Sequence, residues 1–225
     1  MPEKGKKFGA KRVRQSGNGG KMRYQQIVFD VDGTLVDNEE AILLSLQAVM
    51  LEETGKKFPF EELTFALGIP GEDALERLQV ERIPQVMDRW VELLQQYEDQ
   101  VSIYEGIEEL LSELSKAGYG LGIVSSRTKE MFEEDLCISG IRHYFNTVVC
   151  ADDTQGHKPT ADPLLKYMEL SGAGKEEIIF IGDSVHDSKC AENAGVDFAL
   201  AVWGSHKESI RADFYLHRPA DLLSI

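Results

Sequence analysis

The 225-residue sequence predicts an α/β protein with a Rossmann-like parallel sheet and a helical insert after the first strand. Two observations predict this class. From residue 104 onward, short apolar runs alternate with amphipathic helical stretches, which is typical of a parallel sheet covered on both faces. Between residues 38 and 103, apolar residues recur at helical spacing without strand-like alternation. We therefore expect a basic tail at 1–21, an α/β core at 22–37 and 104–225, and a helical cap at 38–103.

The first expected strand, at residues 27–29, runs directly into the sequence Asp-Val-Asp-Gly-Thr at residues 30–34. The two carboxylates, Asp30 and Asp32, repel each other at this spacing. Their placement is explained if a divalent cation or a phosphoryl-transfer reaction uses them. The glycine allows the chain to turn after the strand, and the threonine offers a hydroxyl to fix that turn.

The insert that follows is expected to contain helices only. Asn38 can cap the first helix, which should end near Gly55. Further helices are expected at residues 61–67, 72–78 and 84–97.

The second half of the chain alternates helices with strands. Helices are expected at residues 106–117, through 131 and 136, at 164–170 and before Gly195, and strands at 121–124, 147–150, 178–181 and 198–202. Ligands of such sheets bind at the carboxyl ends of the strands, near the change in strand order. Polar residues that follow these strands are therefore the candidates for a site.

The charge of the chain restricts its partners. The sequence has 24 Lys and Arg against 39 Asp and Glu, a formal net charge of −15, although seven of the basic residues lie in the first 21 positions. We expect that tail to be disordered and the acidic remainder to repel nucleic acid and anionic membranes. Cys137, Cys150 and Cys190 are too widely spaced for a zinc site. We predict a cytoplasmic protein, monomeric or weakly dimeric, without nucleic-acid or membrane partners.

Residues suited to phosphoryl transfer follow four of the expected strands. They are Asp30 with Asp32, Ser125, Lys158, and Asp183 with Asp187. If these strands belong to one parallel sheet, the residues converge at its carboxyl edge. One carboxylate can then attack phosphorus, and a second can act as acid and base. A lysine and a hydroxyl can hold the phosphoryl oxygens, and carboxylates at this edge can supply the oxygen ligands that Mg²⁺ prefers.

In chain order, Asp30-x-Asp32-Gly33-Thr34, a serine after the second strand, Lys158-Pro159 and Gly182-Asp183-x-x-x-Asp187 resemble the four motifs of the haloacid dehalogenase superfamily. The resemblance covers about residues 23–223. It implies a HAD-like fold and a magnesium-dependent phosphatase that hydrolyses a small phosphate monoester through an aspartyl phosphate. Asn38 departs from the family pattern, which more often has a serine there.

The resemblance also implies a role for each motif residue. Asp30 would be the nucleophile and a metal ligand, and Asp32 the general acid and base, whose backbone carbonyl also binds Mg²⁺. The remaining assignments are Ser125 and Lys158 for the phosphoryl group, Asp183 as a metal ligand, and Asp187 for orienting the water shell of the metal.

The insert is similar to the small α-helical cap of the same family, and residues 67–75 resemble the substrate-specificity loop of phosphoglycolate phosphatase-like members. The candidate substrate-binding residues are Gly68, Pro70, Gly71, Ser126 and Arg127. A plain glycine-proline turn explains the loop equally well. A small phosphorylated metabolite such as phosphoglycolate, pyrophosphate or a short sugar phosphate is the expected substrate.

Two alternatives stay open. A sugar phosphomutase related to β-phosphoglucomutase shares the fold, cap and motifs, but it needs cationic cap residues, and residues 65–74 contain no Lys or Arg. A catalytically silent binding or regulatory protein would leave the intact carboxylates without a role. We interpret His157 and His186 as supporting or surface residues. Trp203, just past the fifth expected strand, is interpreted as a residue at the edge of the core rather than as a platform for substrate.

Overall fold

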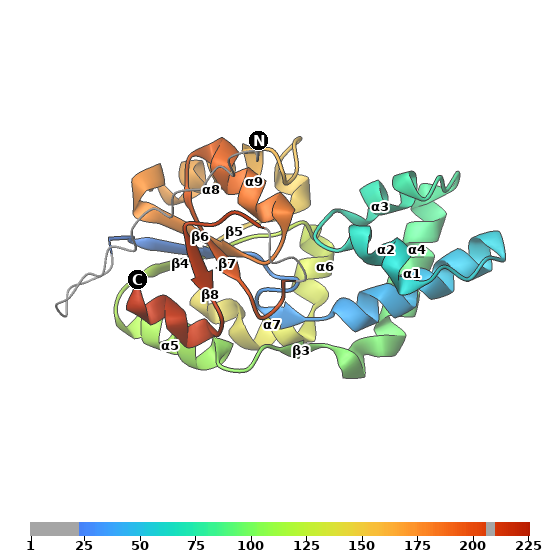
Figure 1. Ribbon diagram of the computed structural model, residues 1–225, viewed down its shortest axis with the longest axis horizontal. Coiled ribbons are helices and arrows are strands. Elements are labelled where there is room, and N and C mark those ends of the chain that lie inside the picture. The colour runs from blue at the N-terminus through green and yellow to red at the C-terminus, as the bar shows by residue number, and fades with distance from the viewer. Residues whose placement is uncertain (1–22, 206–209) are drawn as a thin grey trace, which may run out of the picture.

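The computed structural model describes residues 23–205 and 210–225, so the tail expected to be disordered lies outside these ranges. Six parallel strands form the central sheet in the order β5, β4, β1, β6, β7, β8 (Figure 1). Their bounds are β1 Gln26–Phe29, β4 Gly120–Val124, β5 Thr147–Val149, β6 Ile178–Gly182, β7 Asp197–Ala201 and β8 Phe214–Leu216. The predicted α/β class is therefore confirmed.

The central strand β1 places side chains in two apolar cores, one on each face of the sheet. Ile27 and Phe29 belong to one core and Val28 to the other, and all three are fully buried. Helices α5 (Ile107–Lys116) and α7 (Leu136–Ile141) cover the first face, and α8 (Asp162–Ser171) and α9 (Val185–Ala194) cover the second (Figure 1). A strand buried on both faces needs apolar residues at successive positions, which explains the continuous apolar runs of the sequence.

The strand order reverses at β1. This strand pairs with β4 on one side and with β6 on the other. The chain first extends the sheet through β4 and β5, and it then crosses β1 to add β6, β7 and β8. The carboxyl end of β1 is therefore the place where a parallel sheet of this topology binds its ligands.

The insert between β1 and β4 forms a separate helical body, which projects from one end of the sheet in Figure 1. Its helices are α1 (Glu39–Thr54), α2 (Phe60–Leu63), α3 (Gly71–Arg77) and α4 (Ile83–Leu94), with the 3₁₀ helices η1 (Thr64–Ala66) and η2 (Gln95–Gln100). Leu46, Met50, Leu75 and Trp90 are among the residues of its own buried apolar cluster. We call this body the cap.

Two adjacent connections join the cap to the sheet. Their residues form the antiparallel strands β2 (Val36–Asp37) and β3 (Ser102–Ile103), and the N–H of Tyr104 donates to the carbonyl of Leu35 at 3.1 Å. Any movement of the cap must bend the chain at this pair, because both connections pass through it.

The structure differs from the expected elements in several places, among them the short strands β2 and β3, which were not expected from the sequence. The helix expected through residues 131 and 136 is two helices, α6 (Lys129–Glu134) and α7, because the carboxylate of Asp135 accepts the N–H of Ile138 at 2.9 Å and caps the second one. Asn38 precedes α1 without capping it, since its side chain donates to Asp32 instead. The edge strand β8 was not expected from the sequence.

Short 3₁₀ helices complete the structure: η3 (Arg142–Tyr144), η4 (Ala151–Asp153), η5 (Lys175–Glu177) and η6 (Pro219–Ser224). Within residues 23–205 and 210–225, every helix is too short or too polar to cross a bilayer.

Candidate active site

Four of the predicted site residues gather at the carboxyl edge of the sheet. Asp30 follows β1, Ser125 follows β4 and Asp183 follows β6, while Lys158 reaches the same place from the segment beyond β5. Asp30, Ser125 and Lys158 are each less than 5% exposed. Burying these polar groups is costly unless they are paired, so their contacts indicate what the site is built to hold.

Lys158 lies between two carboxylates. Its Nζ is 2.8 Å from Asp30 Oδ1 and 2.8 Å from Asp187 Oδ1. Asp187 is fixed in turn by Ser184, whose N–H and hydroxyl donate to Asp187 Oδ2 at 3.1 Å and 2.5 Å. Burial alone would lower the pKa of Lys158, but the charges of Asp187 and Asp30 outweigh burial and raise it. Lys158 is therefore a permanent cation at the sheet edge.

This single cation does not balance the carboxylates around it. Ligand atoms of Asp30, Asp183 and Asp187 all lie within 4.8 Å of one another. Burial, followed by repulsion from Asp187, raises the pKa of both Asp30 and Asp183. The second oxygen of Asp30, Oδ2, is buried and has no hydrogen-bond partner among the described residues. Three clustered carboxylates with an unused buried oxygen fit a divalent cation bound by oxygen ligands.

The turn after β1 keeps Asp183 close to Asp30. Gly33 has a φ of 74°, and a Cβ atom at this position would lie 2.5 Å from Asp183 Oδ2. The hydroxyl of Thr34 lies 3.4 Å from Asp183 Oδ1, and the indole N–H of Trp203 donates to the carbonyl of Thr34 at 3.0 Å. Trp203 thus supports the turn, and it is partly buried against the apolar core, which agrees with its interpretation as a residue at the core edge.

Asp32 forms an ion pair with Arg127. The Arg127 Nε lies 3.0 Å from Asp32 Oδ1, Nη2 lies 2.7 Å from the same oxygen, and Nη1 lies 2.5 Å from Asp135 Oδ2. The amide of Asn38 also donates to Asp32 Oδ1, at 2.5 Å. Burial by itself would raise the pKa of Asp32, but the charge and hydrogen bonds of Arg127 outweigh burial and hold that pKa below its ordinary value.

Two of these partners, Asp135 and Asn38, were not expected at the site. Asp135 lies within a stretch that reads as one continuous helix, although its position three residues before Ile138 is that of a helix cap. Asn38 was interpreted as a cap of α1. Sequence spacing contains no signal that an arginine would bring these side chains together.

The cap contacts the sheet edge through the loop between η1 and α3. Gly68 has a φ of 78°, and its carbonyl accepts the hydroxyl of Ser126 at 3.3 Å. A Cβ atom at Gly68 would lie 3.3 Å from the side chain of Ser184, beside Asp187. The expected substrate loop thus reaches the residues that follow β4 and β6. The hydroxyl of Ser125 accepts the N–H of Arg127 at 3.1 Å, which orders the loop after β4.

A cavity of about 530 Å³ lies between the cap and the sheet edge. Six of the predicted residues line it: Asp32, Gly68, Pro70, Gly71, Ser126 and Arg127. His157 is also part of the wall, and its Nδ1 is buried without a hydrogen-bond partner among the described residues. A cavity of this size is within the range of about 300–1,000 Å³ for sites that enclose a small molecule.

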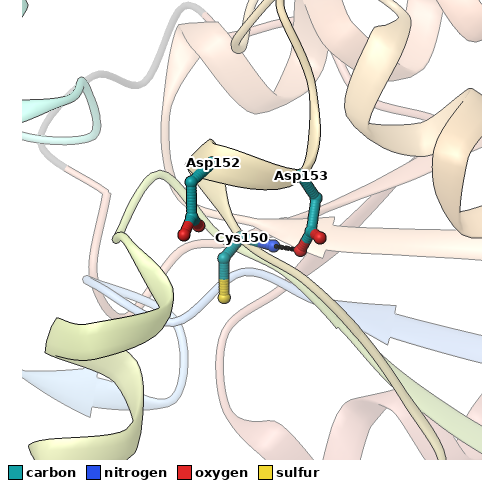
Figure 2. Close-up of side chains that lie close together, drawn as sticks. All are labelled: Cys150, Asp152 and Asp153. Atoms are coloured by element: carbon teal, nitrogen blue, oxygen red, sulfur yellow. Dashed lines mark hydrogen bonds between the residues drawn. The ribbon is translucent and has the colours of Figure 1, made fainter.

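Figure 2 shows a second acidic cluster, just after β5, formed by Cys150, Asp152 and Asp153. Asp153 accepts the N–H of Cys150 at 2.9 Å and forms an ion pair with Lys129 at 2.6 Å, and Asp152 accepts the backbone N–H of Lys129 at 3.1 Å. Burial raises the pKa of the Cys150 thiol to about 12, so the sulfur stays protonated near neutral pH. We interpret these carboxylates as supports for the loop rather than as metal ligands.

The sequence matches a family model described as haloacid dehalogenase-like hydrolase, over residues 27–201. Pyrophosphatase PpaX of Bacillus cereus is 30% identical over 209 residues, which are 91% of this chain and 97% of that protein. Pyrophosphatase PpaX of Bacillus mycoides is 28% identical over the same shares of the two chains.

Solved structures with the same fold include a Lactobacillus plantarum protein provisionally assigned as a phosphoglycolate phosphatase. It is 29% identical, with a TM-score of 0.81 over 90% of this chain and 99% of that chain. CbbY from Rhodobacter sphaeroides, solved in complex with phosphate, is 21% identical, with a TM-score of 0.75 over 88% of this chain and 96% of that chain. At that identity the second likeness concerns the fold alone.

Proposed function

Because this chain belongs to the haloacid dehalogenase-like hydrolase family, we propose that it hydrolyses a small phosphate monoester through an aspartyl phosphate formed on Asp30. One observation carries the proposal. Lys158 holds one oxygen of Asp30 at 2.8 Å, while the other oxygen, Oδ2, has no partner among the described residues. A buried carboxylate that a lysine holds at one oxygen is fixed in the orientation that nucleophilic attack requires.

In the first step, a carboxylate oxygen of Asp30 attacks phosphorus, and the bond between phosphorus and the leaving oxygen breaks. Asp32 donates a proton to that oxygen, so that an alcohol leaves and an aspartyl phosphate forms. Lys158 and Ser125 hold the phosphoryl oxygens, and their burial means that no rearrangement of water is needed as charge develops.

In the second step, Asp32 takes a proton from water, and the water oxygen attacks phosphorus. The bond between phosphorus and Asp30 breaks, which releases inorganic phosphate and restores the carboxylate. Arg127 and Asn38 hold Asp32 as a carboxylate in the observed arrangement, and this is the state that the second step requires.

The three clustered carboxylates fit Mg²⁺, which we propose as the cofactor. The residues that would hold it are Asp30 and Asp183, with the backbone carbonyl of Asp32, while Asp187 stays bound to Lys158 and Ser184. When bound, the ion supplies positive charge that offsets the repulsion between carboxylates and phosphate oxygens.

The net charge of the chain restricts the partners that we propose for it. We propose a cytoplasmic enzyme that acts on a small phosphorylated metabolite, as a monomer or weak homodimer, because the formal net charge of −15 disfavours nucleic acid and anionic membranes. The cap, residues 38–103, would close over the site during the first step and open afterwards, through the paired connections β2 and β3.

A phosphate-release assay tests the proposal. The panel should include phosphoglycolate, pyrophosphate, sugar phosphates and simple alkyl phosphates, with Mg²⁺ and then with Ca²⁺, and it should compare the wild type with Asp30→Asn. We expect turnover with Mg²⁺, less with Ca²⁺ because its coordination is larger and looser, and none in the variant. Absence of phosphate release from every substrate would reject the proposed function.

A further inference from the structure

The cavity between cap and sheet lies on the leaving-group side of the site. Among the described residues, its wall includes Asp32 but none of the buried group Asp30, Lys158 and Asp183. Asp32 is the residue that would give its proton to the leaving oxygen. The phosphoryl group therefore belongs to the tight, buried part of the site, and the occupant of the cavity is the rest of the substrate.

The cap side of this cavity is apolar. Its wall there is formed mainly by Ile42, Ile69, Met87, Trp90, Val91 and Leu94. The indole N–H of Trp90 is already used, since it donates to the hydroxyl of Ser45 at 2.9 Å. Trp90 thus offers ring carbon to an occupant, and Met87 offers a flexible thioether that adapts to different shapes. Such a wall favours a leaving group with an apolar portion.

The charged part of the same wall is almost entirely acidic. Six carboxylates line the cavity: Asp32, Glu72, Glu98, Glu134, Asp135 and Asp152. Arg127 is the only lysine or arginine among the described lining residues, and its guanidinium is already bound to Asp32 and Asp135. The cap therefore contributes no cationic side chain to this wall.

These features decide which leaving groups the cavity accepts. A second anionic group, such as the carboxylate of phosphoglycolate or the second phosphate of pyrophosphate, would need a cation to replace its hydration. Arg127 already faces two carboxylates, Asp32 and Asp135, so its single positive charge is offset and would not balance a further anion. An uncharged alcohol with an apolar portion meets neither obstacle.

We propose that the substrate is a phosphate monoester whose leaving group carries no negative charge and has an apolar portion. This inference rests on the proposed phosphatase function, because it names the substrate class of the same site. Phosphate esters of uncharged, partly apolar alcohols are the preferred substrates, and phosphoglycolate and pyrophosphate are poor ones.

Hexyl phosphate and 6-phosphonooxyhexanoate form a matched pair for the test. Both have a six-carbon chain, and the terminal carboxylate is too far from the ester to change the leaving oxygen. We expect kcat/KM to be higher for hexyl phosphate by about tenfold or more, with phosphoglycolate and pyrophosphate also below it. Equal values for the pair, or a best rate with either phosphoglycolate or pyrophosphate, would overturn the inference.

Charge reversal on the wall gives a second, independent readout. Glu98→Lys and Glu134→Lys each place a cation beside the cavity, and Glu113→Lys on α5 makes the same change in net charge away from it. We expect the first two variants to shift the ratio of kcat/KM values toward the carboxylate substrate, by about tenfold, while the third leaves it unchanged. An equal shift in all three variants would contradict the role of the wall.

p-Nitrophenyl phosphate separates the two possible failures. If it and every other ester release no phosphate, the proposed function fails, and the inference fails with it. If it is hydrolysed while the anionic substrates are preferred, the phosphatase function stands and only the inference on the leaving group is lost.

Discussion

Replacing Lys158 by methionine tests how the buried charges of the site are balanced. Methionine keeps most of the side-chain volume, so the main loss is the ammonium group that lies 2.8 Å from both Asp30 and Asp187. All three side chains are at most 2% exposed. Removing one partner from a buried ion pair leaves an uncompensated charge and typically costs about 3–5 kcal/mol of unfolding free energy. We expect a loss in that range for Lys158→Met without metal at pH 8.

The size of this loss should depend on pH in a defined direction. Burial and the charge of Asp187 raise the pKa of Asp30 to about 7 from 3.8, even though Lys158 lowers it, so removing Lys158 raises that pKa further. A carboxyl group whose pKa is higher in the folded than in the unfolded state stabilises at low pH, and this contribution is lost as pH rises through the two values. The deficit of Lys158→Met should therefore be small at pH 5 and larger at pH 8.

Urea unfolding with EDTA, followed by tryptophan fluorescence, measures both effects. Lys166→Met is the matched control, because Lys166 pairs with Glu169 at 3.1 Å on the surface of α8 and should contribute less than about 1 kcal/mol. If Lys158→Met lost no more stability than this control at pH 8, or lost more at pH 5 than at pH 8, our account of the buried charges would be wrong.

Three further variants or reactions test other parts of the structure. Asp32→Asn should lower the turnover of alkyl phosphates by roughly 10²- to 10⁴-fold, the usual contribution of a general acid and base, and a wild-type rate would remove Asp32 from that role. Gly68→Val places a branched side chain at a backbone position with φ of 78°, beside Ser184. We expect this variant to lower kcat/KM for alkyl esters more than for p-nitrophenyl phosphate. An equal loss for both substrates would argue against this loop as a substrate contact. Iodoacetamide at pH 8 should modify only the partly exposed Cys137 in the folded protein, because burial raises the pKa of Cys150 and Cys190 to about 12. Intact mass spectrometry counts the modified cysteines, and three modifications before unfolding would refute this prediction.

The sheet was predictable because its strands are buried on both faces. Apolar runs such as residues 178–181 specify a strand directly, and a strand, helix, strand pattern allows few topologies. The edge strand β8 lacked these signals: it has three residues, of which Phe214 is partly buried and Tyr215 is exposed. The division of the helix near residue 135 depends on one carboxylate that turns back to cap α7, and helical periodicity does not reveal such a turn.

The site was predictable only as far as strand ends determine position. Asp30, Ser125 and Asp183 each follow a strand of the sheet directly, so parallel topology alone brings them together. The ion pairs of Arg127 with Asp32 and Asp135 depend instead on how loops from different parts of the chain fold back. The spacing of residues in the sequence does not predict these loop conformations. The same holds for the cavity wall, whose residues come from the cap, from the turn after β1 and from the segments after β4 and β5.

The central claim is that a phosphoryl group is transferred to Asp30. Mixing the enzyme with substrate, quenching in acid and reducing with borohydride converts an aspartyl phosphate into homoserine, which peptide mass spectrometry locates. We predict homoserine at position 30 in the wild type and none in Asp30→Asn. Turnover without any reduced residue at position 30, or with one at another carboxylate, would contradict the mechanism.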